Sequence, residues 1–250
     1  MRQRLVAGNW KMHGSKASVA ALLTEIKAGV PSSTVEWAVL PPFIYIEQVA
    51  RALAGSKVAW GAQNLCTMAQ GAYTGEVAAS MLQEFGCRYV LVGHSERRAL
   101  YGESDTVVAE KFTIAQEFGL RPILCVGESL QEREAGLTQR VIERQVGAIL
   151  VLAAKAGALD KAVIAYEPVW AIGTGKTASP EQAQEVHQWI REQVAAENAE
   201  LAQQLPIIYG GSVKAGNARE LFAMPDIDGG LVGGASLQAD EFLKIGEAAA

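Results

Sequence analysis

Short runs of hydrophobic residues recur along the chain at regular spacing. Most are followed by polar or glycine residues and then by a pattern of helical period. Apolar runs of this length are typical of strands that are buried on both faces of a parallel sheet. The runs occupy residues 5–8, 37–40, 58–62, 89–93, 123–126, 163–166, 207–209 and 230–232.

Helical periodicity is strongest over residues 105–118, 138–155 and 180–197. Gly119 stands directly after the first of these segments, where a helix C-terminal cap belongs. The third segment has an apolar stripe with Glu and Gln on the opposite face, as expected for a helix that packs on a core. The stripe consists of Ala183, Val186, Ile190 and Val194.

About eight strand-then-helix units in 250 residues predict an α/β protein, a single (β/α)8 barrel that occupies residues 1–250 as one domain. An open, doubly wound sheet is the alternative. That fold usually carries a G-x-G-x-x-G motif after its first strand, and none follows residues 5–8 here. The pattern therefore favours the barrel.

A barrel of this kind has its active site at the C-terminal ends of its strands, so the polar residues that follow the apolar runs are expected to be neighbours. These residues are Asn9 and Lys11, Gln63 and Asn64, His94, Ser95 and Glu96, Glu128, Glu167, residues 210–212 and residues 233–236.

Glu167 stands where the sixth strand should end, and Pro168 follows it directly. Proline keeps the preceding residue out of the helical region, so the backbone of Glu167 is extended and its carboxylate is directed. Residues 169–178 alternate apolar residues with Gly or Thr, and residues 179–182 supply an N-cap serine, a first-turn proline and a capping box. This layout predicts a catalytic base beside a glycine-hinged lid.

Glycine-rich segments end the seventh and eighth strands, which are adjacent in a barrel. Ser212 follows two glycines, and Gly233 and Gly234 occupy the equivalent place after strand eight. Exposed backbone N–H groups at such positions bind phosphate in many barrels. Glycine could instead only ease the passage from strand to helix, but its presence in both segments favours a phosphate site. Residues 173–177 lack the first glycine of a Walker motif and are interpreted as part of the lid.

His94 is one of three histidines, and it is followed by a possible helix start at Ser95. A helix N-terminus disfavours imidazolium, so a neutral imidazole that donates a hydrogen bond is one interpretation. An ordinary buried or surface histidine is the other, and the sequence leaves both open. His13 and His187 are interpreted as surface or core residues.

Lys11, with Asn9 at the end of the first strand, could be a solvated lysine, but its place suggests a cation that faces an anionic substrate. Glu96 could be a second acid or a structural partner, and support of the Lys11 ammonium is the role we favour. The histidines and cysteines lack the spacing of metal ligands, so no metal is expected.

Composition narrows the choice of partners. Lys and Arg number 22 against 27 Asp and Glu, a net charge of −5, which argues against a nucleic-acid or anionic-membrane surface. No apolar run approaches the roughly 20 residues of a membrane span. Cys66, Cys87 and Cys125 are interpreted as free thiols of a reducing compartment. With no signal-peptide pattern at the N-terminus, a cytoplasmic protein is expected.

Several motifs taken together resemble the signature of the triosephosphate isomerase family, and they lie in the family order across nearly the whole chain. They are GNWK at 8–11, GAYTGE at 71–76, VGHSERR at 92–98, AYEPVWAIGTG at 165–175, YGGSV at 209–213 and LVGGAS at 231–236.

This resemblance implies a cofactor-independent interconversion of dihydroxyacetone phosphate and D-glyceraldehyde 3-phosphate through an enediolate, a step of glycolysis and gluconeogenesis. Glu167 corresponds to the base, and His94 to the electrophile that polarises the carbonyl. Lys11 and Asn9 correspond to the pair that faces the enediolate. The residues that correspond to phosphate-binding backbone donors are Gly173, Ser212, Gly233 and Gly234.

The segment 70–76 is long for a connection between strand and helix, and Tyr73 and Thr74 lie near its tip. It could be a flexible surface loop. The resemblance implies that it inserts into a second subunit, with Thr74 near that subunit's site, and so implies a homodimer.

Two other classes of function fit the sequence less well. A Schiff-base aldolase on the same fold needs a lysine in the barrel, commonly after strand six, where this chain has Glu167. A barrel that only binds sugar phosphates would have no use for a directed carboxylate, a histidine and a lid together. Both are disfavoured.

Overall fold

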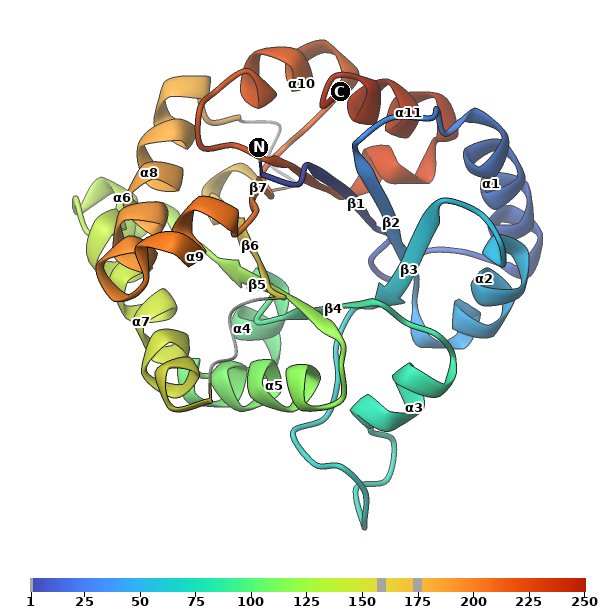
Figure 1. Cartoon of the computed structure of the whole chain (residues 1–250), viewed down its shortest axis with the longest axis horizontal. Helices are drawn as coiled ribbons and strands as arrows, with labels where there is room; N and C mark the ends of the chain where they lie inside the picture. The colour runs from blue at the N-terminus through green and yellow to red at the C-terminus, as the bar shows by residue number, and fades with distance from the viewer. Residues whose placement is uncertain (1, 157–160, 173–176) are drawn as a thin grey trace.

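Eight parallel strands form a closed barrel in the order β1 to β8, as the hydrophobic pattern predicts (Figure 1). The computed structural model describes residues 2–156, 161–172 and 177–250. Leu5 of β1 pairs with both Glu36 of β2 and Gly229 of β8, so the sheet closes on itself. The strands are β1 (Leu5–Asn9), β2 (Glu36–Leu40), β3 (Val58–Ala62), β4 (Tyr89–Val92), β5 (Arg121–Val126), β6 (Val163–Tyr166), β7 (Ile207–Tyr209) and β8 (Gly229–Val232).

Helices surround the barrel, and none among the described residues is long and apolar enough to cross a membrane. The helices are α1 (Lys16–Gly29), α2 (Ile46–Leu53), α3 (Ala79–Glu84), α4 (Ser95–Tyr101), α5 (Asp105–Glu117), α6 (Leu130–Glu134), α7 (Thr138–Ala156), α8 (Pro180–Glu197), α9 (Ala199–Gln204), α10 (Ala215–Phe222) and α11 (Ala239–Glu247). Short 3-10 helices are η1 (Phe43–Tyr45), η2 (Val169–Ala171) and η3 (Gly234–Leu237).

The predicted helix ends are confirmed by their capping geometry. The Ser179 side chain accepts the N–H of Gln182 in a capping box, and Pro180 is the first residue of α8. Gly119 has φ +73°, a left-handed conformation that lets the chain leave α5. Gly93 was predicted to end the fourth strand, but that strand ends at Val92 because Gly93 has φ +69°.

Side chains alternate along each strand between two hydrophobic layers. In β1, Leu5 and Ala7 point into the barrel, whereas Val6 packs against the surrounding helices. All three cysteines are free and buried, as expected from their spacing. The inner layer consists of Leu5, Ala7, Ala38, Leu40, Tyr89, Leu91, Ile123, Cys125, Val163, Ala165, Ile208 and Leu231.

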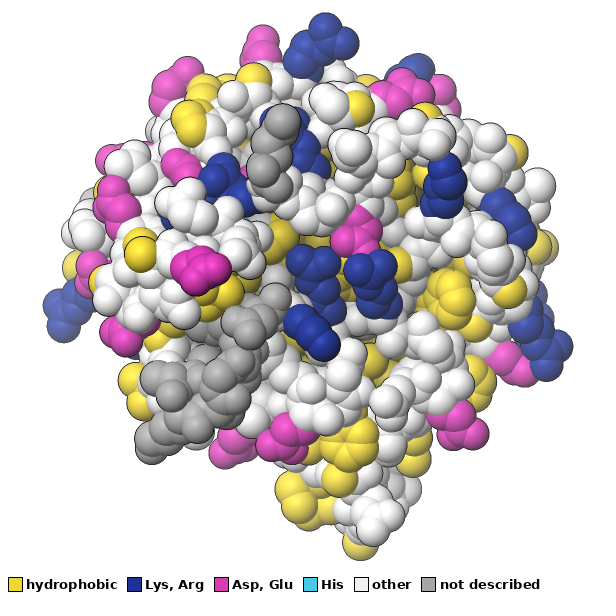
Figure 2. All heavy atoms as spheres, viewed as in Figure 1, with side chains coloured by type: hydrophobic (Ala, Val, Ile, Leu, Met, Phe, Trp, Pro, Cys, Tyr) yellow, Lys and Arg dark blue, Asp and Glu magenta, His cyan; other side chains and the backbone are white. Residues whose placement is uncertain are grey.

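Ion pairs lie at the end of the barrel where the strands begin. Glu36 at the start of β2 pairs with Arg88 at 2.6 Å and with Arg121 at 3.1 Å, although these arginines precede or begin other strands. Arg121 also contacts the hydroxyl of Tyr89 at 3.0 Å. Figure 2 shows basic side chains gathered around an acidic one near the centre of the face turned toward the reader. The contacts of Glu36 and Arg121 hold the starts of distant strands together. They lie at the opposite end of the barrel from the strand ends where polar residues were predicted to cluster.

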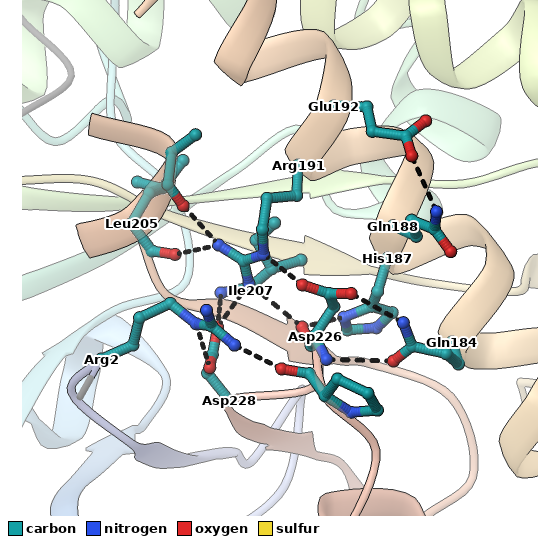
Figure 3. A network of polar contacts seen from close by, with 12 residues as sticks. Arg2, Gln184, His187, Gln188, Arg191, Glu192, Leu205, Ile207, Asp226 and Asp228 are labelled. Carbon is teal, nitrogen blue, oxygen red and sulfur yellow. Dashed lines mark hydrogen bonds and ion pairs between the residues drawn. The ribbon is translucent and has the colours of Figure 1, made fainter. Parts of the chain in front are cut away.

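A second buried network joins α8 to the start of β8 (Figure 3). Arg191 contacts Asp226 at 2.5 Å and Asp228 at 2.8 Å. Asp228 also accepts the N–H of Ile207 at 2.9 Å and pairs with Arg2 at 2.7 Å. The first residues of β1, β7 and β8 are therefore fixed to one charged centre.

His187 on the same helix is a core residue. Its Nδ1 lies 3.1 Å from the carbonyl oxygen of Asp226, and its ring packs edge-on against Tyr166. Burial lowers the pKa of His187 to about 4, so it stays neutral at neutral pH. His187 does not line the pocket at the C-terminal ends of the strands.

Replacing Arg191 with Met should destabilise the fold by about 3–5 kcal/mol, because Asp226 and Asp228 lose the cation that offsets their burial. Urea denaturation at a fixed protein concentration measures the change. Arg140→Met removes an exposed arginine as the matched control and should stay within about 0.5 kcal/mol of the parent chain. Equal effects of the two variants would contradict a structural role for the network.

Candidate active site

A pocket of about 330 Å³ opens at the C-terminal ends of the strands. It brings together seven of the residues predicted as site residues, which the sequence spreads over more than two hundred positions. Gly173 lies outside the described residues, as do residues 174–176 of the predicted lid. The seven are Asn9, Lys11, His94, Glu167, Ser212, Gly233 and Gly234.

Glu167 is held at the end of β6 by the backbone of neighbouring strands. Its N–H donates to the carbonyl oxygen of Val126 at 2.7 Å, and the residue is 2% exposed. One carboxylate oxygen accepts the N–H of Ser95 at 2.9 Å, and the other lies 3.0 Å from Nε2 of His94. Both oxygens therefore contact the beginning of α4.

These contacts decide the charge of the carboxylate. Burial raises the pKa of Glu167, whereas His94 and the N–H of Ser95 lower it, and the balance is a pKa below the usual value. A hydrogen bond to the charged form favours that form even in a buried position. Glu167 is ionised at neutral pH.

His94 precedes α4, and its side chain caps that helix. Its Nδ1 accepts the N–H of Glu96 at 3.3 Å, which requires that Nδ1 carry no proton. The neutral ring is then protonated at Nε2, the atom that faces Glu167. Burial lowers the pKa of His94 and the Glu167 carboxylate raises it, with a net rise while the two are in contact.

Lys11 has a strained backbone. Its φ is +51°, the left-handed region, which no other non-glycine residue in the described part of the chain adopts. Its N–H donates to Oδ1 of Asn9 at 3.0 Å, and Gln63 donates from Nε2 to its carbonyl oxygen at 2.8 Å. The Lys11 ammonium forms an ion pair with Glu96, the support that was predicted. Strain of this kind persists only where surrounding contacts impose it.

The positions after β7 and after β8 differ in why glycine occupies them. A Cβ on Gly211 would lie 2.2 Å from the Tyr209 hydroxyl, and one on Gly210 would lie 2.9 Å from Cγ of Glu167. A Cβ on Gly234 would meet nothing within 4 Å. Packing therefore requires glycine at positions 210 and 211. At position 234 a side chain would meet no neighbour, and glycine there leaves the backbone accessible from the pocket.

Comparison with known proteins shows which family the chain belongs to. The model of the triosephosphate isomerase family matches residues 4–249. This chain belongs to that family. Curated relatives named triosephosphate isomerase include those of Thiobacillus denitrificans, 63% identical over 250 residues, and of Nitrosococcus oceani, 60% identical over 253 residues. A third, from Dechloromonas aromatica, is 63% identical over 249 residues. Each match covers 100% of this chain and 100% of the relative.

Several residues of this triosephosphate isomerase family member were placed at strand ends by the sequence but given no role, and two of them support the site. One is Gln63, described above. The other is Glu128, which is fully buried and bonds Nε1 of Trp170 at 2.9 Å and the hydroxyl of Tyr166 at 3.1 Å. Arg133 balances its charge at 3.0 Å. Glu128 thus fixes η2, the turn that leads from Glu167 into residues 173–176.

Proposed function

We propose that this chain interconverts dihydroxyacetone phosphate and D-glyceraldehyde 3-phosphate without a cofactor, with Glu167 as the base and His94 as the electrophile. The observation that carries the proposal is the buried, ionised carboxylate of Glu167 in contact with a histidine N–H inside one pocket. Moving a proton between two carbons beside a carbonyl needs a base and a hydrogen-bond donor to the oxygen. This pair supplies both.

Glu167 acts as a base only after its carboxylate moves. Its two oxygens contact His94 and Ser95 in the structure, so neither is free for a substrate proton. Rotation toward the pocket releases both contacts, and the desolvated carboxylate then loses the hydrogen bonds that lower its pKa. A stronger base therefore faces the substrate carbon, and His94 becomes free to donate from Nε2 to the substrate oxygen.

Negative charge on that oxygen in the enediolate is stabilised by Lys11 and Asn9, which line the same pocket. The left-handed backbone of Lys11 fixes where its side chain begins, and the ion pair with Glu96 limits where its ammonium lies. Donors positioned before the reaction need no rearrangement as charge develops. The Lys11 ammonium is therefore preorganised to stabilise the enediolate.

We infer that the phosphate group is bound by backbone N–H groups of Ser212, Gly233 and Gly234; Gly173, the fourth donor that the family resemblance implies, lies outside the described residues. The open space at Gly234 and the short helix η3 that starts there support this assignment. Helix starts attract anions because their first N–H groups have no partner within the helix.

Replacing Glu167 with Asp tests the base. The change withdraws the carboxylate by one methylene, and a misplacement of ~1 Å can cost about 10²-fold in rate. We expect kcat for D-glyceraldehyde 3-phosphate to fall by about 10²-fold with a smaller change in KM. Glu110→Asp, on the exposed face of α5, is the matched control. Equal turnover by both variants would remove Glu167 from the mechanism, and no turnover by the parent chain would contradict the proposed reaction.

We also propose a homodimer, because exposed hydrophobic side chains gather on the segments that follow β1 to β4. The segment between β3 and α3, which holds Tyr73 and Thr74, projects away from the barrel (Figure 1). A groove of about 380 Å³ lies beside it, between α2 and α3. Exposed apolar side chains that form a contiguous patch are typical of interfaces. The exposed side chains are Met12, Phe43, Ile44, Met68, Tyr73, Met81, Phe85, Leu100 and Tyr101.

Replacing Ile44 with Asp should weaken self-association by at least about tenfold, since it places a carboxylate in a dry contact. Sedimentation over a concentration series measures the dissociation constant. Val151→Asp alters another exposed residue, on α7, and should leave it unchanged. A parent chain that sediments as a monomer at every concentration would contradict the dimer.

The chain is further proposed to act in the cytoplasm, as a single barrel domain. Three buried free thiols suit a reducing compartment, where disulfides do not form. Fractionation of the source cells tests the location.

A further inference from the structure

Charges around the active-site pocket do not by themselves favour a phosphate dianion. Glu167 is ionised and lies in the pocket wall. The Lys11 ammonium is paired with Glu96, so that pair adds little net charge. The whole chain has a net charge of −5, which repels anions at long range. A further cation near the entrance would therefore help to attract a substrate that carries two negative charges.

Lys214 is placed to supply that cation. It lines the pocket beside Ser212 and Val213, its side chain is exposed, and among the described residues it forms no ion pair. Of the residues that the structure describes, Lys11 and Lys214 are the lysines that line the pocket, and no described arginine lines it. Lys11 is paired with Glu96, whereas no carboxylate among the described residues pairs with Lys214.

The backbone of Lys214 is fixed although its ammonium is free. Its N–H donates to Oδ1 of Asn217 at 2.8 Å at the start of α10. Glu241 lies beside this segment, but its carboxylate accepts the N–H of the next residue, Ala215, at 3.2 Å. The side chain of Lys214 therefore starts from a defined point on the phosphate side of the pocket.

We propose that Lys214 is a capture residue: its ammonium draws the substrate phosphate toward the pocket and favours phosphorylated over neutral trioses. This inference rests on the proposed function. An ammonium attracts a dianion through water before the two groups make contact. Because the Debye length is only ≈ 8 Å at physiological ionic strength, the effect weakens as salt is added. The gain lies in association, since a flexible exposed lysine offers no fixed contact to the transition state.

The test compares Lys214→Met with Lys57→Met over a series of ionic strengths. Lys57 precedes β3 at the opposite end of the barrel, so its replacement changes net charge equally without altering the pocket. At low salt we expect kcat/KM for D-glyceraldehyde 3-phosphate to fall about three- to fivefold in Lys214→Met only, with kcat unchanged. The difference should vanish at high salt, Lys214→Arg should keep the parent value, and turnover of unphosphorylated D-glyceraldehyde should not change.

Equal kcat/KM values for Lys214→Met and Lys57→Met at low salt would overturn the proposal. A loss that persists at high salt, or that appears in kcat, would also overturn it, because it would assign Lys214 a structural role. These results presuppose a parent chain that turns over the phosphorylated substrate. Absence of that turnover would instead contradict the proposed function.

Discussion

The contact between the Glu167 carboxylate and the beginning of α4 is the interaction on which the site depends. It joins the end of β6 to the end of β4 through His94 and Ser95, and it keeps a charge in a position that is 2% exposed. A buried carboxylate without such partners would take up a proton. The same helix start sets the tautomer of His94, because the N–H of Glu96 donates to Nδ1 and leaves the proton on Nε2. One helix start thus organises both of the proposed reacting groups.

Other parts of the barrel stabilise features that are unfavourable locally. Lys11 keeps a left-handed backbone only because Asn9 and Gln63 bond it on both sides. At the opposite end, buried ion pairs around Arg191 and Glu36 hold the strand starts. Residues that break local rules usually mark functional sites and depend on stability supplied elsewhere in the fold. The barrel therefore has its candidate site at the C-terminal ends of the strands and its stabilising ion pairs at their N-terminal ends.

Sequence reasoning succeeded where the signal was local. Apolar runs predicted eight strands, and Ser179 and Gly119 marked helix ends, because strand burial and capping depend on neighbouring residues. The strand-end rule also selected seven of the residues that line the pocket. Periodicity overran the fourth strand by one residue, at Gly93, because a left-handed glycine ends that strand without changing the hydrophobic pattern.

The rest depends on contacts between distant segments. Gln63 bonds Lys11, and Arg191 bonds Asp228, across separations that no local pattern encodes. Gly210 and Gly211 belong to a segment predicted to bind phosphate, and steric contacts with Glu167 and Tyr209 give a separate reason why glycine is needed there. Such reasons become visible only when side chains are placed in space.

The contact between Glu167 and His94 is tested most directly by nitrogen-15 NMR of the His94 ring. The spectra of the parent chain and of Glu167→Gln are compared. The account predicts that neutral His94 carries its proton on Nε2. It also predicts a lower pKa for His94 in Glu167→Gln, because the carboxylate that raises that pKa is gone. A proton on Nδ1, or a His94 pKa that the substitution leaves unchanged, would contradict it.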